Sequence, residues 1–228
     1  MQLSRPHACT GFVALWLLLT PVFAAAQVGS NPLLSDDQLW VFGVWGAEAV
    51  GKSAGEGFGA TQITMAGFHA GRVFHRSSLD SGLRRSWEYT VELQPLFLVT
   101  HVHQAYGGGF APVGLKWNFA PRGRYRPYLE FNGGAMITQK NVPRGDTSAF
   151  NFTAAFGPGV LIAVNRTQAI GFALRWWHLS NAGLGSINPS FNTIEFEVGY
   201  HWLTSRHAGR GRISASPTQA QPSTSSAR

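Results

Sequence analysis

Apolar and polar side chains alternate along most of the chain between residues 39 and 202, in runs separated by clusters of Gly, Pro, Asn and Asp. A period of two is typical of β-strands, because successive side chains on a strand point to opposite faces. The pattern predicts eight strands, at residues 39–50, 61–75, 86–101, 109–119, 126–138, 149–164, 168–180 and 191–202.

Several of these runs are ten or more residues long. Strands that cross a membrane need about 9–11 residues, whereas strands of globular proteins average about 5–6. Long strands in an even number, with one apolar and one polar face, are typical of outer-membrane barrels. We therefore expect an all-β fold, an eight-stranded antiparallel up-and-down transmembrane β-barrel. Side chains fill the lumen of a barrel this narrow, so we expect no aqueous pore.

The predicted inner faces carry charges that must find partners in a closed lumen. An internal ion-pair network is expected among Glu88, Glu92, Lys116, Glu130, Arg175, Glu195 and Glu197. The alternation alone does not show which face of each strand points into the barrel and which points outward. A soluble β-sandwich or a lipocalin-like barrel, with the apolar faces turned inward, stays open as an alternative.

The N-terminus has the pattern of a secretory signal peptide, with Arg5 and His7 before an apolar run at 11–19 and Ala24-Ala25-Ala26 at the cleavage site. Cleavage there would remove Cys9, the one cysteine of the chain, and leave no thiol for a disulfide or a nucleophile. The C-terminal stretch is rich in Ser, Pro, Gln and Thr and is expected to be disordered. The predicted division is a signal peptide at 1–26, a lead-in at 27–38, the barrel at 39–203 and a basic tail at 204–228.

The formal net charge is +7. For an exported chain, anionic lipid head groups or lipopolysaccharide phosphates are better candidate partners than nucleic acid, and we expect no nucleic-acid binding. No phosphate-binding loop, nucleotide fingerprint or metal-ligand spacing is present in the sequence, so no cofactor or metal is expected. The histidines at 69, 75, 101 and 103 are predicted to lie on rims and turns.

Candidate chemistry is concentrated at the end of the seventh predicted strand. His178 and Ser180 share a face that is otherwise large and apolar, about 7 Å apart, which an imidazole can bridge. A serine hydroxyl needs such a base to become a nucleophile. Asn192 begins the next strand on the same face, and backbone N–H groups of the turn after Ser180 are candidates for an oxyanion hole. Both barrel termini lie on the periplasmic side, so these residues are predicted at the outer rim, facing lipid.

Two motifs carry a resemblance to a known family. HLSNAG at 178–183, followed by NPSFN at 188–192, resembles the PagL-type lipid A 3-O-deacylases and the wider outer-membrane acyl-hydrolase group. Similar strand motifs are ELQPLF at 92–97, GLKWNF at 114–119, RPYLEFNGG at 126–134 and FNFTAAFGPG at 150–159.

The resemblance implies an eight-stranded barrel with a serine hydrolase site that faces the membrane at the outer surface. It implies His178 as general base, Ser180 as nucleophile, and the backbone around Asn181 and Gly183 as oxyanion hole. The family has a glutamate as the third member where this chain has Asn192. An asparagine can still accept a hydrogen bond from the base, but it lacks the charge that stabilises imidazolium.

The expected function is that of an outer-membrane serine ester hydrolase that removes an acyl chain from lipid A or a related outer-leaflet lipid, at the 3-O position by resemblance. The expected location is the bacterial outer membrane, with the active site at the outer surface, and a homodimer is left open. One alternative is a non-catalytic barrel with a structural or adhesive role. Another is a soluble lipid carrier.

Overall fold

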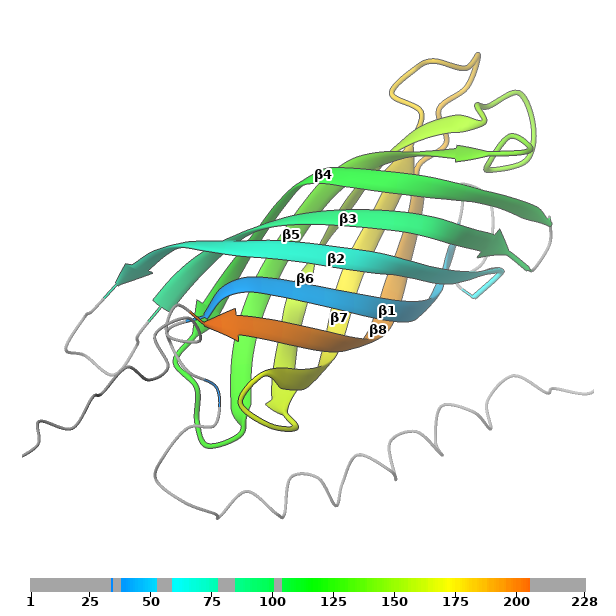
Figure 1. Ribbon diagram of the computed structural model, residues 1–228. Coiled ribbons are helices and arrows are strands. Elements are labelled where there is room, and N and C mark those ends of the chain that lie inside the picture. The colour runs from blue at the N-terminus through cyan, green and yellow to red at the C-terminus, as the bar shows by residue number, and fades with distance from the viewer. Residues whose placement is uncertain (1–33, 35–37, 53–58, 78–84, 101–103, 206–228) are drawn as a thin grey trace, which may run out of the picture.

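Eight antiparallel strands close into one barrel, in which each strand pairs with the next and β8 pairs with β1 (Figure 1). The computed structural model describes residue 34 and residues 38–52, 59–77, 85–100 and 104–205. The strands are β1 (Gln38–Lys52), β2 (Thr61–Ser77), β3 (Arg85–Val99), β4 (Ala105–Phe119), β5 (Tyr125–Thr138), β6 (Phe150–Ala163), β7 (Gln168–Ser180) and β8 (Phe191–Ser205). The fold class predicted from the alternation is confirmed.

Most strand boundaries lie within a few residues of the prediction, and the largest difference is at the start of β4. This strand begins at Ala105, which pairs with Val99, and not at residue 109. Its first half contains three consecutive glycines at 107–109, which have no side chains and therefore show no alternation. The predicted signal peptide, and almost all of the lead-in and the tail, lie outside the described residues.

The outer surface of the barrel is apolar, and among the described residues 25 large hydrophobic side chains are exposed, most of them on the strands. On β7, for example, Leu174 and Trp176 are exposed, whereas Arg175 and Trp177, which alternate with them, are buried. This is the arrangement expected for strands that face lipid on one side. Among the described residues, no helix is long and apolar enough to cross a membrane.

A layer of charged side chains crosses the middle of the lumen, and Arg175 lies at its centre. Its Nε donates to Glu195 Oε1 at 3.1 Å, and its guanidinium also contacts Glu197 at 2.5 Å and Glu92 and Glu130 at 3.5 Å each. Lys116 Nζ lies 3.2 Å from Glu130 Oε2. The predicted ion-pair network is confirmed for these residues.

Two histidines belong to this interior layer, and the prediction that His69 lies on a rim or turn was wrong. His69 is buried, with its Nε2 3.3 Å from Glu88 Oε1 and its Nδ1 3.7 Å from Glu92 Oε1. His201 is also buried and meets the His69 ring edge-on at 5.7 Å. A Cβ at Gly43 or Gly171 would lie within 2.7 Å of the His201 ring, so these glycines make room for it. Gly67 and Gly71 interrupt the alternation on the inner face of β2, so the sequence pattern did not predict this face.

The two ends of the lumen are apolar. The sequence pattern had predicted polar inner faces and did not predict these apolar ends. One cluster contains Leu34, Val41 and Tyr128, and the other contains Phe97, Trp177, Leu179 and Phe191. The second cluster lies at the end of the barrel where β7 passes into β8. Its side chains pack on the lumen side of that hairpin, behind the outward-facing residues of the candidate site.

Candidate active site

The β7–β8 hairpin brings His178 and Asn192 together on the outer face of the barrel. The two residues pair directly across the strands, and His178 Nδ1 lies 2.9 Å from Asn192 Oδ1. A carbonyl oxygen can only accept, so this bond places the hydrogen on Nδ1 and leaves Nε2 as an acceptor. A histidine in this tautomer can take a proton from a hydroxyl group.

Ser180 is the last residue of β7 and points to the same face as His178. It is half-buried and pairs with Phe152 on β6. Within the described residues its hydroxyl makes no hydrogen bond, so the structure does not join Ser180 to His178. In the absence of substrate, catalytic hydrogen bonds are often long and tighten only when the substrate binds.

The imidazole of His178 is stacked on the indole of Trp176, with ring centroids 5.3 Å apart and an angle of 19° between the planes. Trp176 precedes His178 by two residues and therefore shares its face of the strand. The stack and the hydrogen bond from Nδ1 together determine the orientation of the ring. The strand spacing predicts the shared face but not the contact between the two rings.

The turn after Ser180 has a backbone that few residues adopt. Ala182 has φ of 51° and Gly183 has φ of 84°, both in the left-handed region. The buried Asn181 side chain holds this turn, since its Oδ1 accepts from Gly183 N at 2.9 Å and its Nδ2 donates to Ile187 O at 2.9 Å. Asn181 is thus a structural centre of the loop between β7 and β8.

The two backbone N–H groups predicted for the oxyanion hole already have acceptors. Asn181 N donates to Asn188 Oδ1 at 3.0 Å, and Gly183 N donates to Asn181 Oδ1. Either group would become available if the amide side chain that covers it turned away. The Ala182 N–H between them makes no hydrogen bond within the described part of the chain and is a ready donor. The oxyanion role of Asn181 and Gly183 stays a prediction.

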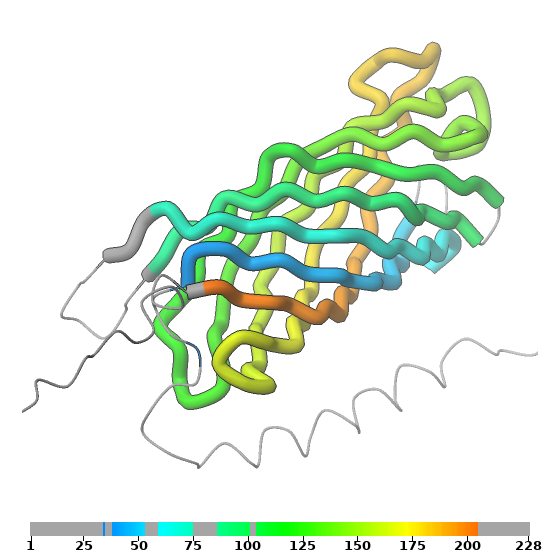
Figure 2. Tube along the Cα trace, in the orientation of Figure 1, coloured from blue at the N-terminus to red at the C-terminus, as the bar shows by residue number. Residues whose placement is uncertain are grey.

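The loop between β5 and β6 extends from the same end of the barrel as the loop between β7 and β8 (Figures 1 and 2). Ile187 N donates to Asp146 O at 3.2 Å, which joins the two loops. A Cβ on Gly185 would come within 2.7 Å of Thr147 O, so the loops are in close contact there. Two loops far apart in sequence therefore form one structure beside Ser180.

No carboxylate of the hairpin reaches His178. Glu195 and Glu197 are buried in the lumen against Arg175, as the strand alternation had predicted. Asn192 is therefore the residue in the position of a triad's third member. Within the described residues, no group of three or more His, Cys, Asp or Glu side chains is arranged to hold a metal ion.

Comparison with known proteins gives one family match. The family model "Lipid A 3-O-deacylase (PagL)" matches residues 67–201, more than half of the chain, and so includes His178, Ser180 and Asn192. No curated protein matches the chain.

Three solved structures are similar at low sequence identity. The crystal structure of the outer membrane enzyme PagL is 18% identical, covering 68% of this chain and 97% of that chain, with a TM-score of 0.41. Neisserial surface protein A is 15% identical, covering 72% and 97%, with a TM-score of 0.46. The outer membrane protein OprG from Pseudomonas aeruginosa is 8% identical, covering 77% and 100%, with a TM-score of 0.43.

Proposed function

Because this chain belongs to the lipid A 3-O-deacylase (PagL) family, we propose that it is a serine ester hydrolase of the bacterial outer membrane that removes an acyl chain from lipid A. The 3-O position is part of the proposal and rests on the family description. The observation that carries the mechanism is the hydrogen bond from His178 to Asn192, which prepares a base beside Ser180 on the lipid-facing side.

In the first step, His178 Nε2 takes the proton from Ser180 Oγ while the oxygen attacks the ester carbonyl carbon. The negative charge that develops on the carbonyl oxygen is stabilised by N–H donors of the turn after Ser180, of which Ala182 N is free. The bond between the carbonyl carbon and the sugar oxygen then breaks as His178 returns the proton to that oxygen, and the acyl group remains on Ser180. In the second step, His178 takes a proton from water while the water oxygen attacks the acyl carbon. The bond between that carbon and Ser180 Oγ breaks, His178 returns the proton to Oγ, and the fatty acid leaves.

The location of the site suits a substrate that stays in the membrane. His178 and Ser180 point away from the lumen at the end of an apolar surface, so a lipid ester can meet them without leaving the bilayer. Lys52 pairs with Asn192 across β1 and β8, and it places a positive charge beside the site for an anionic head group.

We assign this end of the barrel to the outer surface of the cell, since it carries the longer loops. Ser186 is exposed in the loop at the same end. A Ser186→Cys variant should react with a membrane-impermeant maleimide on intact cells. Labelling of Ser186→Cys only after the cells are permeabilised would place the site on the periplasmic side.

A structural or adhesive barrel remains the second candidate function. Two observations favour it, namely the absence of a hydrogen bond between Ser180 and His178 within the described residues and the asparagine in the position of the acid. Such a protein would keep the fold and the loops but would not release fatty acid.

The Ser180→Ala variant separates the two functions. Purified wild-type protein in detergent micelles should release free fatty acid from lipid A, and Ser180→Ala should lower the rate by about 10³-fold or more, because the nucleophile is lost. The barrel should remain folded, since the Ser180 hydroxyl makes no hydrogen bond within the described residues and the substitution leaves the backbone pairing with Phe152 in place. Lipid A left intact by the wild type would favour the structural barrel.

A further inference from the structure

The outer face of β1 carries a carboxylate on a surface that faces lipid. Six glutamates lie in the part of the chain that the structure describes, and those at 88, 92, 130, 195 and 197 are buried in the lumen. Glu48 is the sixth, and it is exposed on the same face of β1 as Phe42 and Val44. A charged side chain on this face costs free energy. An ionisable residue at membrane depth therefore indicates a functional site, and it needs a partner.

Apolar side chains lie between Glu48 and the loop end of the barrel. Val50 follows on the same face of β1 and pairs with Ile194 on β8, which is exposed. Glu48 itself pairs with Phe196. Gln62 on β2, which pairs with Val50, is a polar side chain close by, but no hydrogen bond joins it to Glu48 within the described residues. The carboxylate thus lies within the apolar wall of the barrel and not at its edge.

Thr64 is the residue of the described chain that bonds to the Glu48 carboxylate. The two residues pair across β1 and β2, and Thr64 Oγ1 donates to Glu48 Oε1 at 2.6 Å. This bond uses the hydroxyl hydrogen, so Glu48 Oε2 and the lone pairs of Thr64 Oγ1 remain as acceptors. Within the described residues no cation contacts Glu48. Glu48 and Thr64, the acceptor pair, therefore call for a ligand that supplies donors and a positive charge.

Room for a hydrocarbon chain lies next to the acceptor pair, on the side away from the loops. Gly46 and Ala66 pair with each other across β1 and β2, two residues from the acceptor pair. A Cβ at Gly46 would meet no atom closer than 3.8 Å, so the space over this glycine is open. Val198 pairs with Gly46, Leu96 pairs with Ala66, and both of these aliphatic side chains are exposed. A lipid chain that lies between Val198 and Leu96 has its head group at the acceptor pair.

We propose that Glu48 and Thr64 bind the primary ammonium group of a membrane lipid, as in a phosphoethanolamine head group, and that a chain of this lipid lies over Gly46 and Ala66. An ammonium group brings the positive charge that Glu48 lacks and N–H donors for the free acceptors of the pair. A calcium ion takes about six to eight oxygen ligands, whereas the pair has only one carboxylate and one hydroxyl.

The inference goes beyond the proposed hydrolysis and does not depend on it. Glu48 and Thr64 precede residue 67, where the family match begins. Lys52 pairs with Asn192, and Glu48 lies four residues further along β1, roughly 13 Å away. The bound lipid therefore lies beside the catalytic residues and not on them.

Binding of two lipids with the same acyl chains, phosphatidylethanolamine and phosphatidylcholine, tests the proposal. Their head groups differ in the nitrogen, which is a primary ammonium in one and a quaternary ammonium without N–H groups in the other. Delipidated protein in detergent micelles is titrated with each lipid, and native mass spectrometry gives the two Kd values. The wild type should bind phosphatidylethanolamine about tenfold more tightly than phosphatidylcholine. Equal Kd values would overturn the proposal.

Glu48→Gln should abolish this preference, because it removes the charge. The barrel should remain folded, since the amide oxygen of glutamine can still accept from Thr64. Asp146→Asn is the matched control, because it removes the same charge from an exposed residue in the loop between β5 and β6, and it should keep the preference. A preference in Glu48→Gln equal to that of the wild type would overturn the proposal.

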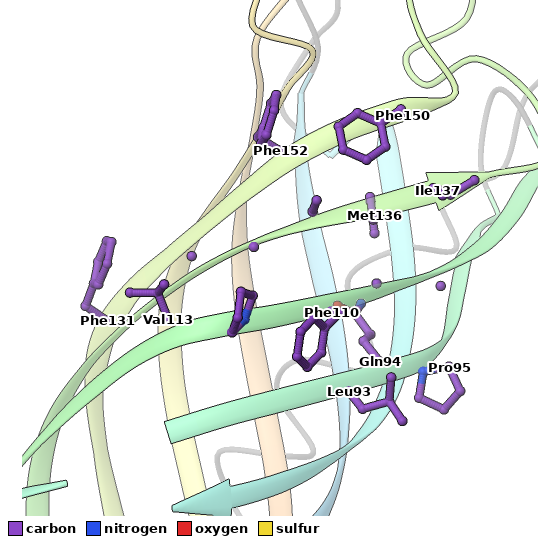
Figure 3. A pocket seen from close by; sticks show the side chains of 16 residues that line it. Leu93, Gln94, Pro95, Phe110, Val113, Phe131, Met136, Ile137, Phe150 and Phe152 are labelled. Atoms are coloured by element: carbon purple, nitrogen blue, oxygen red, sulfur yellow. The ribbon is translucent and has the colours of Figure 1, made fainter. Parts of the chain in front are cut away.

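Gly46→Leu tests the position of the lipid chain, since it fills the open space and should also reduce the preference. Gly133→Leu is the control, because a Cβ at Gly133 would likewise meet nothing closer than 3.8 Å. Gly133 lies in an apolar pocket on the outer face of β3 to β6, and none of the described residues that line this pocket is charged (Figure 3). Gly133→Leu should therefore keep the preference. The same preference in both variants would overturn the proposed position of the lipid.

Two other occupants would give different results. Calcium that binds the wild type but not Glu48→Gln in calorimetric titration, together with equal Kd values for the two lipids, would assign the carboxylate to a divalent cation. A wild-type dimer in lipid-free detergent that Glu48→Gln makes monomeric, again with equal Kd values, would assign it to a second copy of the chain. Either result would overturn the proposal.

Discussion

At the scale of single residues, the partner of His178 is neutral, and this lack of a negative charge distinguishes the site from a complete Ser-His-Asp or Ser-His-Glu triad. Asn192 Oδ1 holds the hydrogen on Nδ1, so the tautomer is the one that a base requires. In the proposed mechanism His178 takes the proton from Ser180, and a neutral amide does not stabilise the imidazolium that this step would form. In a serine protease, where an asparagine in this role also imposes the wrong tautomer, the exchange costs about 10⁴ in kcat.

We therefore expect Asn192→Glu to raise kcat for ester hydrolysis, by at least about tenfold and by less than the ~10⁴ of the protease, since the tautomer is already correct here. Asn192→Ala should lower kcat, because Nδ1 then loses its acceptor. Initial rates on one lipid ester measure both effects. A rate for Asn192→Glu at or below that of the wild type would show that the charge is not what the site lacks.

At the scale of elements, the loop between β7 and β8 is organised by one amide side chain. Asn181 joins Gly183 and Ile187, and Ile187 in turn joins Asp146 in the loop between β5 and β6. The N–H donors beside Ser180 therefore depend on contacts between two loops. Barrel stability depends instead on the strands.

Asn181→Ala removes two hydrogen bonds, each worth about 1 kcal/mol, and should lower kcat by about tenfold or more as the turn loses its geometry. The urea midpoint of the barrel should change little. Asn165→Ala is the control, because Asn165 Oδ1 accepts from Thr167 N at 2.9 Å in a similar turn at the opposite end. Equal activity of Asn181→Ala and Asn165→Ala would show that the turn has no part in catalysis.

The alternation of side chains predicted the elements well where both faces carried side chains. On β7 and β8 it placed His178, Ser180 and Asn192 outside and Glu195 and Glu197 inside, as the structure has them. It did not find the start of β4 or the inner face of β2, where glycines interrupt the pattern. The hydrogen bonds of Asn181 and the contact between loops 139–149 and 181–190 depend on tertiary structure, which a strand period does not report.

At the scale of the whole molecule, the lumen of the barrel is filled by a charged layer that lies between two apolar clusters. Five glutamates, at 88, 92, 130, 195 and 197, share the buried partners Arg175, Lys116 and His69. Arg175 contacts four of these carboxylates. A buried ion loses its hydration, so the network stabilises the fold only while its members remain paired.

Arg175→Met should lower the free energy of unfolding by about 3–5 kcal/mol, because it leaves Glu195 and Glu197 without their cation. Arg72→Met is the control, since Arg72 is exposed and lies over the Trp40 ring at 5.3 Å, a contact worth about 1 kcal/mol or less. Urea titration in detergent micelles measures both. Similar losses in the two variants would contradict a central role for Arg175.

The proposed hydrolysis requires that Ser180 be a nucleophile that His178 activates. Its most direct measurement is the reaction of the detergent-solubilised barrel with a fluorophosphonate that carries an alkyl chain, followed by peptide mass spectrometry. The wild type should gain one phosphonate on Ser180, and His178→Ala should react far more slowly. A Ser180 that stays unmodified in the wild type, or that reacts as fast in His178→Ala as in the wild type, would contradict the proposed hydrolysis.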